Sequence, residues 1–338
     1  MGERFYKPEL DALRFFAFLA VLVHHGPAAP GFAGVVRDFG GFGLSMFFVL
    51  SAYLITELLL REREQTGAIA WKFFFVRRAL RIWPLYFAAV LPFADHHALV
   101  GMILFVANWS AADPGQLVAP LWSISIEEQF YLLWPPVMKV RAELWASIAC
   151  IAGAGAWIWI FAGKGWKLWY DTPVEFLFFA TGALIAIAKP RVKRAGDRMF
   201  LLGAGLVLLW IAASLGVGSA ETTGMTRATL LTGYALGALG CAAVFLAVLG
   251  IGRAPKLLTY AGRISYGLYV FHSAALELVR RLPLPAHTAL RMIGVDGAAL
   301  VLSFAAAHFS YRHFEKPFLV LKERFAVIKS SIPFAAST

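Results

Sequence analysis

The first hydrophobic segment of the chain carries residues that could do acid–base chemistry. Over residues 8–26, an apolar run of membrane length is interrupted by Asp11, Arg14, His24 and His25. A charged side chain near the hydrocarbon costs about 2.5 to 3.5 kcal/mol on the mildest insertion scale, so such residues are rare and mark functional sites. This segment is therefore the first place to look for a site.

Helical spacing puts three of these residues in one line. At about 100° per residue, the steps from Arg14 to His25 make roughly three whole turns, so the two side chains share a face. Asp11 lies three residues before Arg14 and joins that face, where an ion pair would lower the cost of both charges. His24 points elsewhere. The alternative is a structural Asp–Arg pair followed by two capping histidines.

A second polar stripe is predicted in the segment WSISIEEQFYLLWP. Ser123, Glu127 and Tyr131 recur every four residues in an otherwise apolar helix, as expected for a helix that faces an interior cavity. Glu127 could pair with Arg14 or orient an imidazole base at His25. Structural pairing with any arginine of the bundle is the alternative.

Two further groups could contact a substrate. Arg78 and Arg81 are three residues apart, so both guanidinium groups could grip one polyanion from the same side of a helix. Anchoring to lipid headgroups would explain them equally well. The segment ISYGLYVFHS forms a possible second polar wall, although packing within the bundle could account for its histidine. The polar residues of this wall are Ser265, Tyr266, Tyr269 and His272.

The composition defines the class of fold that must position these residues. Of 338 residues, 60% are hydrophobic and 15% are charged, which is too much apolar surface for a soluble fold to bury. The apolar runs are long and continuous, which favours helices over a barrel. We therefore predict an all-α, polytopic transmembrane helical bundle in which residues 1–338 form a single integral-membrane domain.

The hydrophobic runs predict ten spanning helices and one segment that does not span. Residues 97–109 are apolar but too short to cross comfortably, so they are expected to be re-entrant or interfacial. The later basic loops then fall on the cytoplasmic side with both termini, and residues 316–338 form a short basic tail. The predicted spans cover residues 8–26, 40–60, 80–93, 123–139, 144–162, 173–188, 199–216, 228–250, 264–281 and 292–312.

Charge and motif content exclude several classes. The net charge of +11 comes from bases in short loops between hydrophobic segments, so it does not indicate a nucleic acid partner. Cys150 and Cys241 lie inside apolar runs, and no metal-ligand spacing or phosphate-binding loop is present, so no metal is expected. A proton-coupled transporter or flippase of a glycoconjugate is the rival function, but the sequence shows no inverted repeat.

The motifs together resemble membrane-bound acyltransferase family 3, whose bacterial members O-acylate cell-surface carbohydrates. The resemblance begins with LDALRFFAFLAVLVHH, where Arg14 and His25 have the family's spacing, and covers most of the chain. Two departures are Ala52-Tyr53, where the family usually has Gly-Phe, and the extra His24. The other motifs, in the family's order, are FFVLSAYLIT, VRRALRIWPLY, LWSISIEEQFYLLWP, ISYGLYVFH and FEKPF.

The resemblance implies an activity, its partners and a location. The expected reaction moves an acyl group, commonly acetyl, from cytoplasmic acyl-CoA to a hydroxyl group of a cell-surface saccharide or related acceptor. It takes place at the outer face of the bacterial inner membrane. The implied partners are acyl-CoA as donor substrate, a carbohydrate or glycolipid acceptor, and membrane lipids.

The resemblance and the residue pattern together suggest roles for the candidate residues. His25 is the general base for the acceptor hydroxyl or a covalent acyl relay, Arg14 stabilises the thioester end, and Glu127 orients or balances their charges. Arg78 and Arg81 are expected to clamp the phosphates of CoA. Supporting positions are Asp11, Ser123, Tyr131, Ser265, Tyr266 and His272.

Overall fold

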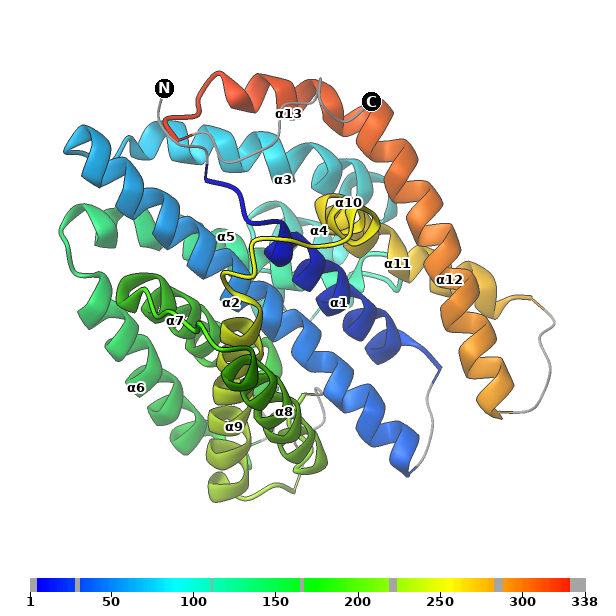
Figure 1. Cartoon of the computed structure of the whole chain (residues 1–338). Helices are drawn as coiled ribbons and strands as arrows, with labels where there is room; N and C mark the ends of the chain where they lie inside the picture. The colour runs from blue at the N-terminus through cyan, green and yellow to red at the C-terminus, as the bar shows by residue number, and fades with distance from the viewer. Residues whose placement is uncertain are drawn as a thin grey trace.

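Long helices joined by short loops make up nearly all regular structure in the described residues (Figure 1), so the all-α prediction is confirmed. The computed structural model describes residues 5–27, 31–110, 112–164, 167–218, 224–282 and 288–328. The α-helices are α1 (Pro8–His25), α2 (Phe32–Thr66), α3 (Trp71–Phe93), α4 (His96–Ile103), α5 (Trp122–Lys139), α6 (Glu143–Phe161), α7 (Thr172–Ala188), α8 (Ala195–Ser214), α9 (Arg227–Val248), α10 (Lys256–Arg263), α11 (Ser265–Arg280), α12 (Thr288–Ser310) and α13 (Lys316–Glu323).

Five helical stretches in the described residues are long and apolar enough to cross a membrane. Five other helices that were predicted to span are not among them. Charged residues interrupt α1, α3 and α5, whereas α7 and α11 have only 17 and 16 residues. Helices α1, α3, α5 and α11 carry the candidate site, so their polar groups weaken the membrane signal. The count of ten spans remains a prediction. The five stretches are Phe32–Thr66, Glu143–Phe161, Ala195–Ser214, Arg227–Val248 and Ile293–Glu323.

The segment 97–109 forms no helix of membrane length, as predicted. The eight residues of α4 rise only about 12 Å, and the 3₁₀ turn η1 (Ala107–Trp109) follows them. Two other boundaries differ from prediction. Helix α2 has 35 residues and begins at Phe32, while α3 already begins at Trp71 and so includes the whole cationic stretch.

The C-terminal segment is more ordered than a tail. Within the predicted basic tail, residues 316–323 form α13 and continue α12 through the π-helical turn η4 (Tyr311–Glu315). Helix α13 lies along α3 (Figure 1). Arg77 joins them, since its Nη1 donates to the carbonyl of Phe325 at 2.7 Å and its Nη2 lies 3.4 Å from Glu62 Oε2. Leu319 of α13 is buried, and burial of this apolar side chain favours the packing of α13 against the bundle.

Helix α1 packs against α2, α10 and α11 (Figure 1). The contact with α2 is close because glycines of α2 face the backbone of α1. A Cβ atom added at Gly43 would meet the carbonyl oxygen of Ala17, and one at Gly40 would meet that of Ala20. Small residues allow helix backbones to approach in this way inside a membrane bundle. The position of α1 therefore depends on these glycines.

Gly43→Ala is expected to destabilise the protein by about 1 to 3 kcal/mol, because the new methyl group pushes α1 away from α2. Thermal unfolding of purified protein in detergent would measure this. Gly203→Ala is the matched control, since a Cβ at that position of α8 meets nothing within 4 Å. There the gain in helix propensity should leave stability unchanged or raise it. Equal destabilisation of both variants would contradict the close-packing argument.

Candidate functional site

The polar residues predicted from the sequence gather along α1, which passes from one end of the candidate site to the other. The helical rise puts Arg14 and His25 about 16 Å apart along the axis. Their side chains therefore serve two ends of one site and do not contact each other. Helices α3 and α5 supply residues around Arg14, and α11 supplies residues around His25.

At the first end, Arg14 forms the predicted ion pair. Its Nη1 lies 3.5 Å from Asp11 Oδ1, and Tyr6 donates a hydrogen bond of 2.9 Å to Asp11 Oδ2. Burial and the neighbouring Asp11 carboxylate raise the pKa of Tyr6 to about 12, so this phenol keeps its proton and remains a donor. Asp11 thus has two partners that hold it beside Arg14.

At the second end, His25 meets His272 of α11. The Nε2 atom of His272 lies 3.3 Å from Nδ1 of His25, and the two rings have centroids 5.0 Å apart. His272 is fully buried, and Phe18 packs edge-on against its ring. The polar wall predicted on α11 therefore reaches the histidine of α1.

Backbone carbonyl groups define the tautomers of this pair. His272 Nδ1 faces the carbonyl of Tyr269 at 2.5 Å, and His25 Nδ1 faces that of Val21 at 3.0 Å. A carbonyl oxygen only accepts, so both Nδ1 atoms carry the proton. The one proton on His25 Nδ1 is then shared between the Val21 carbonyl and Nε2 of His272. In this tautomer Nε2 of His25 has a lone pair, and no hydrogen bond from a described residue occupies it. His25 is therefore arranged as a neutral base.

A small cavity lies beside His25. Its volume of about 50 Å³ has room for a few water molecules or a substrate hydroxyl, but not for a sugar ring. His24 also lines it, so the prediction that His24 points away from the site is wrong. Its Nδ1 lies 2.9 Å from the carbonyl of Arg37, whose Nε donates to the His24 carbonyl at 2.7 Å. Other lining residues are Val21, Gly41, Leu44, Trp122, Trp169, Tyr170 and Tyr269.

The second polar wall touches the start of α5. The hydroxyl of Tyr269 lies 2.6 Å from Ser123 Oγ, and it donates to the carbonyl of Pro120. Tyr266 instead donates to the carbonyl of Ile82 at 2.7 Å, so it ties α11 to α3. Ser265 is buried at the beginning of α11. Tyr269 therefore lines the cavity, Ser123 contacts the Tyr269 hydroxyl, and Tyr266 supports the packing of helices.

Glu127 has a different partner from the ones we predicted. It accepts a short hydrogen bond of 2.5 Å from Ser51 of α2, instead of pairing with Arg14 or orienting His25. Its charge still interacts with the phenols of Tyr131 and Tyr269. Glu127 therefore lies between the two ends of the site. Ser51 stands in the motif FFVLSAYLIT, which is the sequence signal that could have identified it.

Glu127→Gln is expected to lower kcat/KM at least about tenfold for the acyl transfer that the sequence resemblance implies, because it removes a hydrogen-bonded carboxylate from the middle of a cationic and phenolic site. Initial rates on purified protein would test this. The control is Glu128→Gln, the same isosteric change at the next residue, whose Oε2 accepts from Trp83 at 3.2 Å. That variant should change the rate less than about threefold. Equal losses would show that the effect is not specific to Glu127.

Cations accumulate near Arg14. Arg78 lies over the ring of Tyr131 at 5.6 Å, and its buried Nε has no hydrogen-bond partner among the described residues. Arg14, Arg78 and Arg81 are close enough for their charges to interact. Lys322 of α13, which the sequence analysis missed because it placed this residue in a tail, interacts with Arg78 and Arg81 as well. Four close cations favour an anionic ligand between them.

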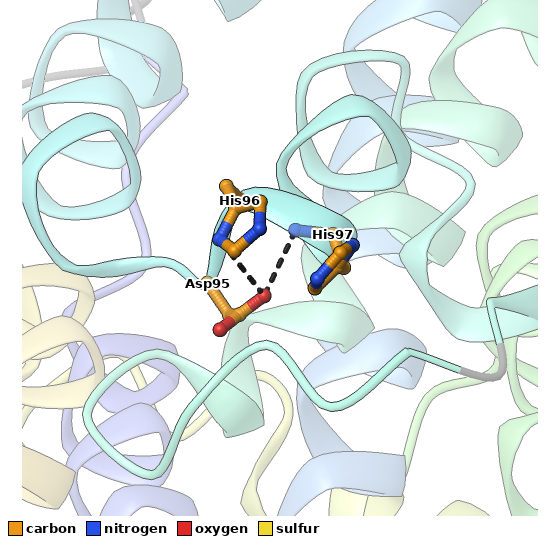
Figure 2. A group of neighbouring side chains, drawn as sticks. All are labelled: Asp95, His96 and His97. Atoms are coloured by element: carbon orange, nitrogen blue, oxygen red, sulfur yellow. Dashed lines mark hydrogen bonds and ion pairs between the residues drawn. The ribbon is translucent and has the colours of Figure 1, made fainter.

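One group elsewhere has the ligand types of a metal site (Figure 2). Asp95, His96 and His97 are consecutive, and their ligand atoms lie within 4.8 Å of one another. Asp95 Oδ1 already accepts from the backbone N–H of His97 at 2.8 Å as the cap of α4, and the His96 side chain is 80% exposed. Helix capping explains this arrangement, and none of the three residues lines the cavity beside His25.

The fold and the site together define a class of protein: a helical membrane protein with a polar site along one buried helix. The chain belongs to the family described as "Acyltransferase domain", which matches residues 7–308. This confirms the resemblance found in the sequence motifs. The family, the apolar helices and the names of similar proteins support an acyltransferase of membrane character.

Similar proteins carry consistent names. A Staphylococcus aureus (strain MSSA476) protein named "Putative O-acetyltransferase" is 25% identical over 93% of this chain and 57% of its own length. "Peptidoglycan O-acetyltransferase OatA" of Listeria monocytogenes is 26% identical over 82% of this chain and 50% of its own length. The chain thus spans little more than half the length of these relatives. No solved structure matches it.

Proposed function

We propose that this protein is an O-acyltransferase that moves an acyl group, most simply acetyl, from acyl-CoA to a hydroxyl group of a cell-surface saccharide. The observation that carries the proposal is the contact of His25 Nδ1 with Nε2 of His272 and the Val21 carbonyl, from which we infer a lone pair on His25 Nε2. The names of the relatives support a saccharide acceptor and an acetyl group.

The chemistry at His25 follows from its tautomer. Nε2 takes the proton of the acceptor hydroxyl while the oxygen attacks the thioester carbonyl carbon. The carbon–sulfur bond then breaks, and the imidazolium returns its proton to the departing thiolate. His25 is the last residue of α1, where the negative end of the helix dipole stabilises the positive charge formed in the step. His272 acts as a positioning residue by accepting from Nδ1 of His25.

The donor is proposed to enter from the other end of α1. Arg78 and Arg81 would bind the CoA phosphates, with Lys322 adding charge. The pantetheine arm is long and mostly apolar, so it suits the distance of about 16 Å from Arg14 to His25. Arg14 would stabilise the negative charge that develops as the thioester reacts. The cavity beside His25 must widen to admit the acyl group.

We further propose a bacterial inner-membrane location, ten spans and both termini in the cytoplasm. The basic residues of the loop between α7 and α8 support this orientation. A single cysteine at Arg194, in a variant without Cys150 and Cys241, should be labelled by an impermeant maleimide only after the membrane is opened. Labelling of intact cells would reverse the orientation.

A transfer assay tests the proposed function directly. Protein in proteoliposomes is supplied with labelled acetyl-CoA on the donor side and a saccharide acceptor on the other, and labelled ester is counted. Covalent transfer is expected from wild type and not from His25→Ala. Movement of the saccharide across the membrane without ester formation would instead favour a transporter or flippase.

A further inference from the structure

A second concentration of positive charge surrounds a cavity of about 410 Å³ that shares no lining residue with the site along α1, α5 and α11. Its walls come from the start of α1, the middle of α2, the segment joining α7 to α8, and the end of α9. Six basic side chains and a single acid, Glu57, line it. The bases are Lys7, Arg61, Lys189, Arg191, Lys193 and Arg198.

Three of the six bases have partners that explain them. Arg61 pairs with Glu57 at 2.7 Å, and Lys189 pairs with Glu64 at 3.1 Å. Arg198 has a structural role, because it donates to three backbone carbonyls and so holds the segment between α7 and α8 against the end of α9. These carbonyls belong to Val192 at 2.6 Å, Ala247 at 2.8 Å and Leu249 at 2.9 Å.

The other three bases, Lys7, Arg191 and Lys193, form no ion pair within the described part of the chain. Among the described residues, Lys7 lies over the ring of Phe5, whose centroid is 5.7 Å from its ammonium group. Arg198 fixes the loop that carries Arg191 and Lys193, so their backbone is held beside the cavity. Like charges around one hollow repel each other unless an anion lies between them.

We propose that this cavity binds a phosphate group, held by Lys7, Arg191 and Lys193. Arginine and lysine are the residues that bind phosphate by charge-assisted hydrogen bonds. Ordinary membrane anchoring needs only basic residues in exposed loops, whereas these converge on a hollow from separate segments. Ile185, Ala186 and Leu249 give the walls an apolar part. The phosphate can therefore belong to an anionic lipid headgroup or to a nucleotide.

Two binding measurements on the full chain in detergent separate these sources. One measures retention of phosphatidylglycerol relative to phosphatidylcholine by native mass spectrometry. The other measures the dissociation constant of adenosine 3′,5′-bisphosphate by calorimetry. The nucleotide measurement uses protein that also carries Arg78→Gln/Arg81→Gln, so that binding at the proposed donor site does not contribute. A failure of the proposed donor site is therefore distinguishable from a failure of this proposal.

The test variant is Lys7→Gln/Arg191→Gln/Lys193→Gln. The matched control, Lys139→Gln/Arg253→Gln/Lys256→Gln, removes the same residue types from exposed positions outside the cavity lining. A third variant, Lys7→Arg/Arg191→Lys/Lys193→Arg, keeps the charge. All three change side chains that are exposed or, at Lys7, half-buried, so folding should be retained, and unfolding temperature checks this.

We expect the test variant to lose at least about tenfold in affinity for one of the two ligands, while the control stays within about twofold of wild type. The charge-preserving variant should recover most of the loss. The ligand that is lost identifies the source of the phosphate. Unchanged binding of both ligands, or equal losses in test and control variants, would overturn the proposal.

Discussion

His25→Ala is expected to lower the rate of acyl transfer by about 10²- to 10⁴-fold, because the variant lacks the proposed base for the acceptor proton. The folded protein should remain in the membrane, since the ring borders a small cavity and does not fill a tight core. Initial rates at saturating acetyl-CoA, with expression measured on the same samples, provide the test. Hydrolysis of acetyl-CoA by water should fall in parallel.

His24→Ala is the control for this prediction. His24 lines the same cavity, but its contact is with Arg37 and its ring is not part of the pair with His272. The variant should keep its rate within about tenfold of wild type. If both alanine variants lost activity equally at equal expression, the choice of His25 would have no basis.

Variants of His272 test its proposed role as the residue that positions His25. His272→Gln keeps an oxygen that can accept from His25 Nδ1, whereas His272→Phe removes it at similar size. The glutamine variant should therefore retain more activity. The pH at which kcat/KM reaches half its maximum should shift in His272→Phe. A purely structural role would lower the amount of folded protein and leave that pH unchanged.

The sequence predicted contacts that depend on one helix. Asp11 and Arg14 pair because residues three apart share a face, and no tertiary information is needed for that. The stripe of Ser123, Glu127 and Tyr131 on α5 follows from the same periodicity. The helical fold itself follows from the long apolar runs.

Contacts between helices could not be predicted in this way. His25 and His272 are 247 positions apart, and Glu127 meets Ser51 across 76 positions. Such partners depend on how the helices pack and rotate, which periodicity does not specify. The prediction for His24 used its angular position on the helix, which fixes only the direction of the Cα–Cβ bond. Rotation about χ1 and χ2 can still turn the imidazole ring into a neighbouring cavity. Lys322 was missed because a basic segment at the end of the chain was predicted to be a tail. Its packing against α3 is a tertiary contact that the sequence pattern does not show.

Arg78→Gln/Arg81→Gln is expected to weaken acyl-CoA binding by about 10²-fold or more, since charge-assisted hydrogen bonds contribute about 1.5 to 3 kcal/mol each. In the proposed binding mode these arginines contact only parts of the donor that do not react. Their loss should therefore raise KM and leave kcat little changed. Calorimetry with a non-reactive acyl-CoA analogue measures the affinity directly. Lysine at both positions should recover only part of it, because an ammonium lacks the planar fork.

Arg77→Gln separates donor binding from anchoring. Arg77 is the neighbouring guanidinium on α3, but its contacts are with Glu62 and the carbonyl of Phe325. Removing it should lower the unfolding temperature without a change in acyl-CoA affinity in the protein that folds. If Arg78 and Arg81 only anchored the helix to lipid, their double variant would behave like Arg77→Gln. An unchanged dissociation constant in the well-folded double variant would show that the CoA phosphates bind elsewhere. The buried Nε of Arg78, which has no hydrogen-bond partner among the described residues, would then need another anion as its partner.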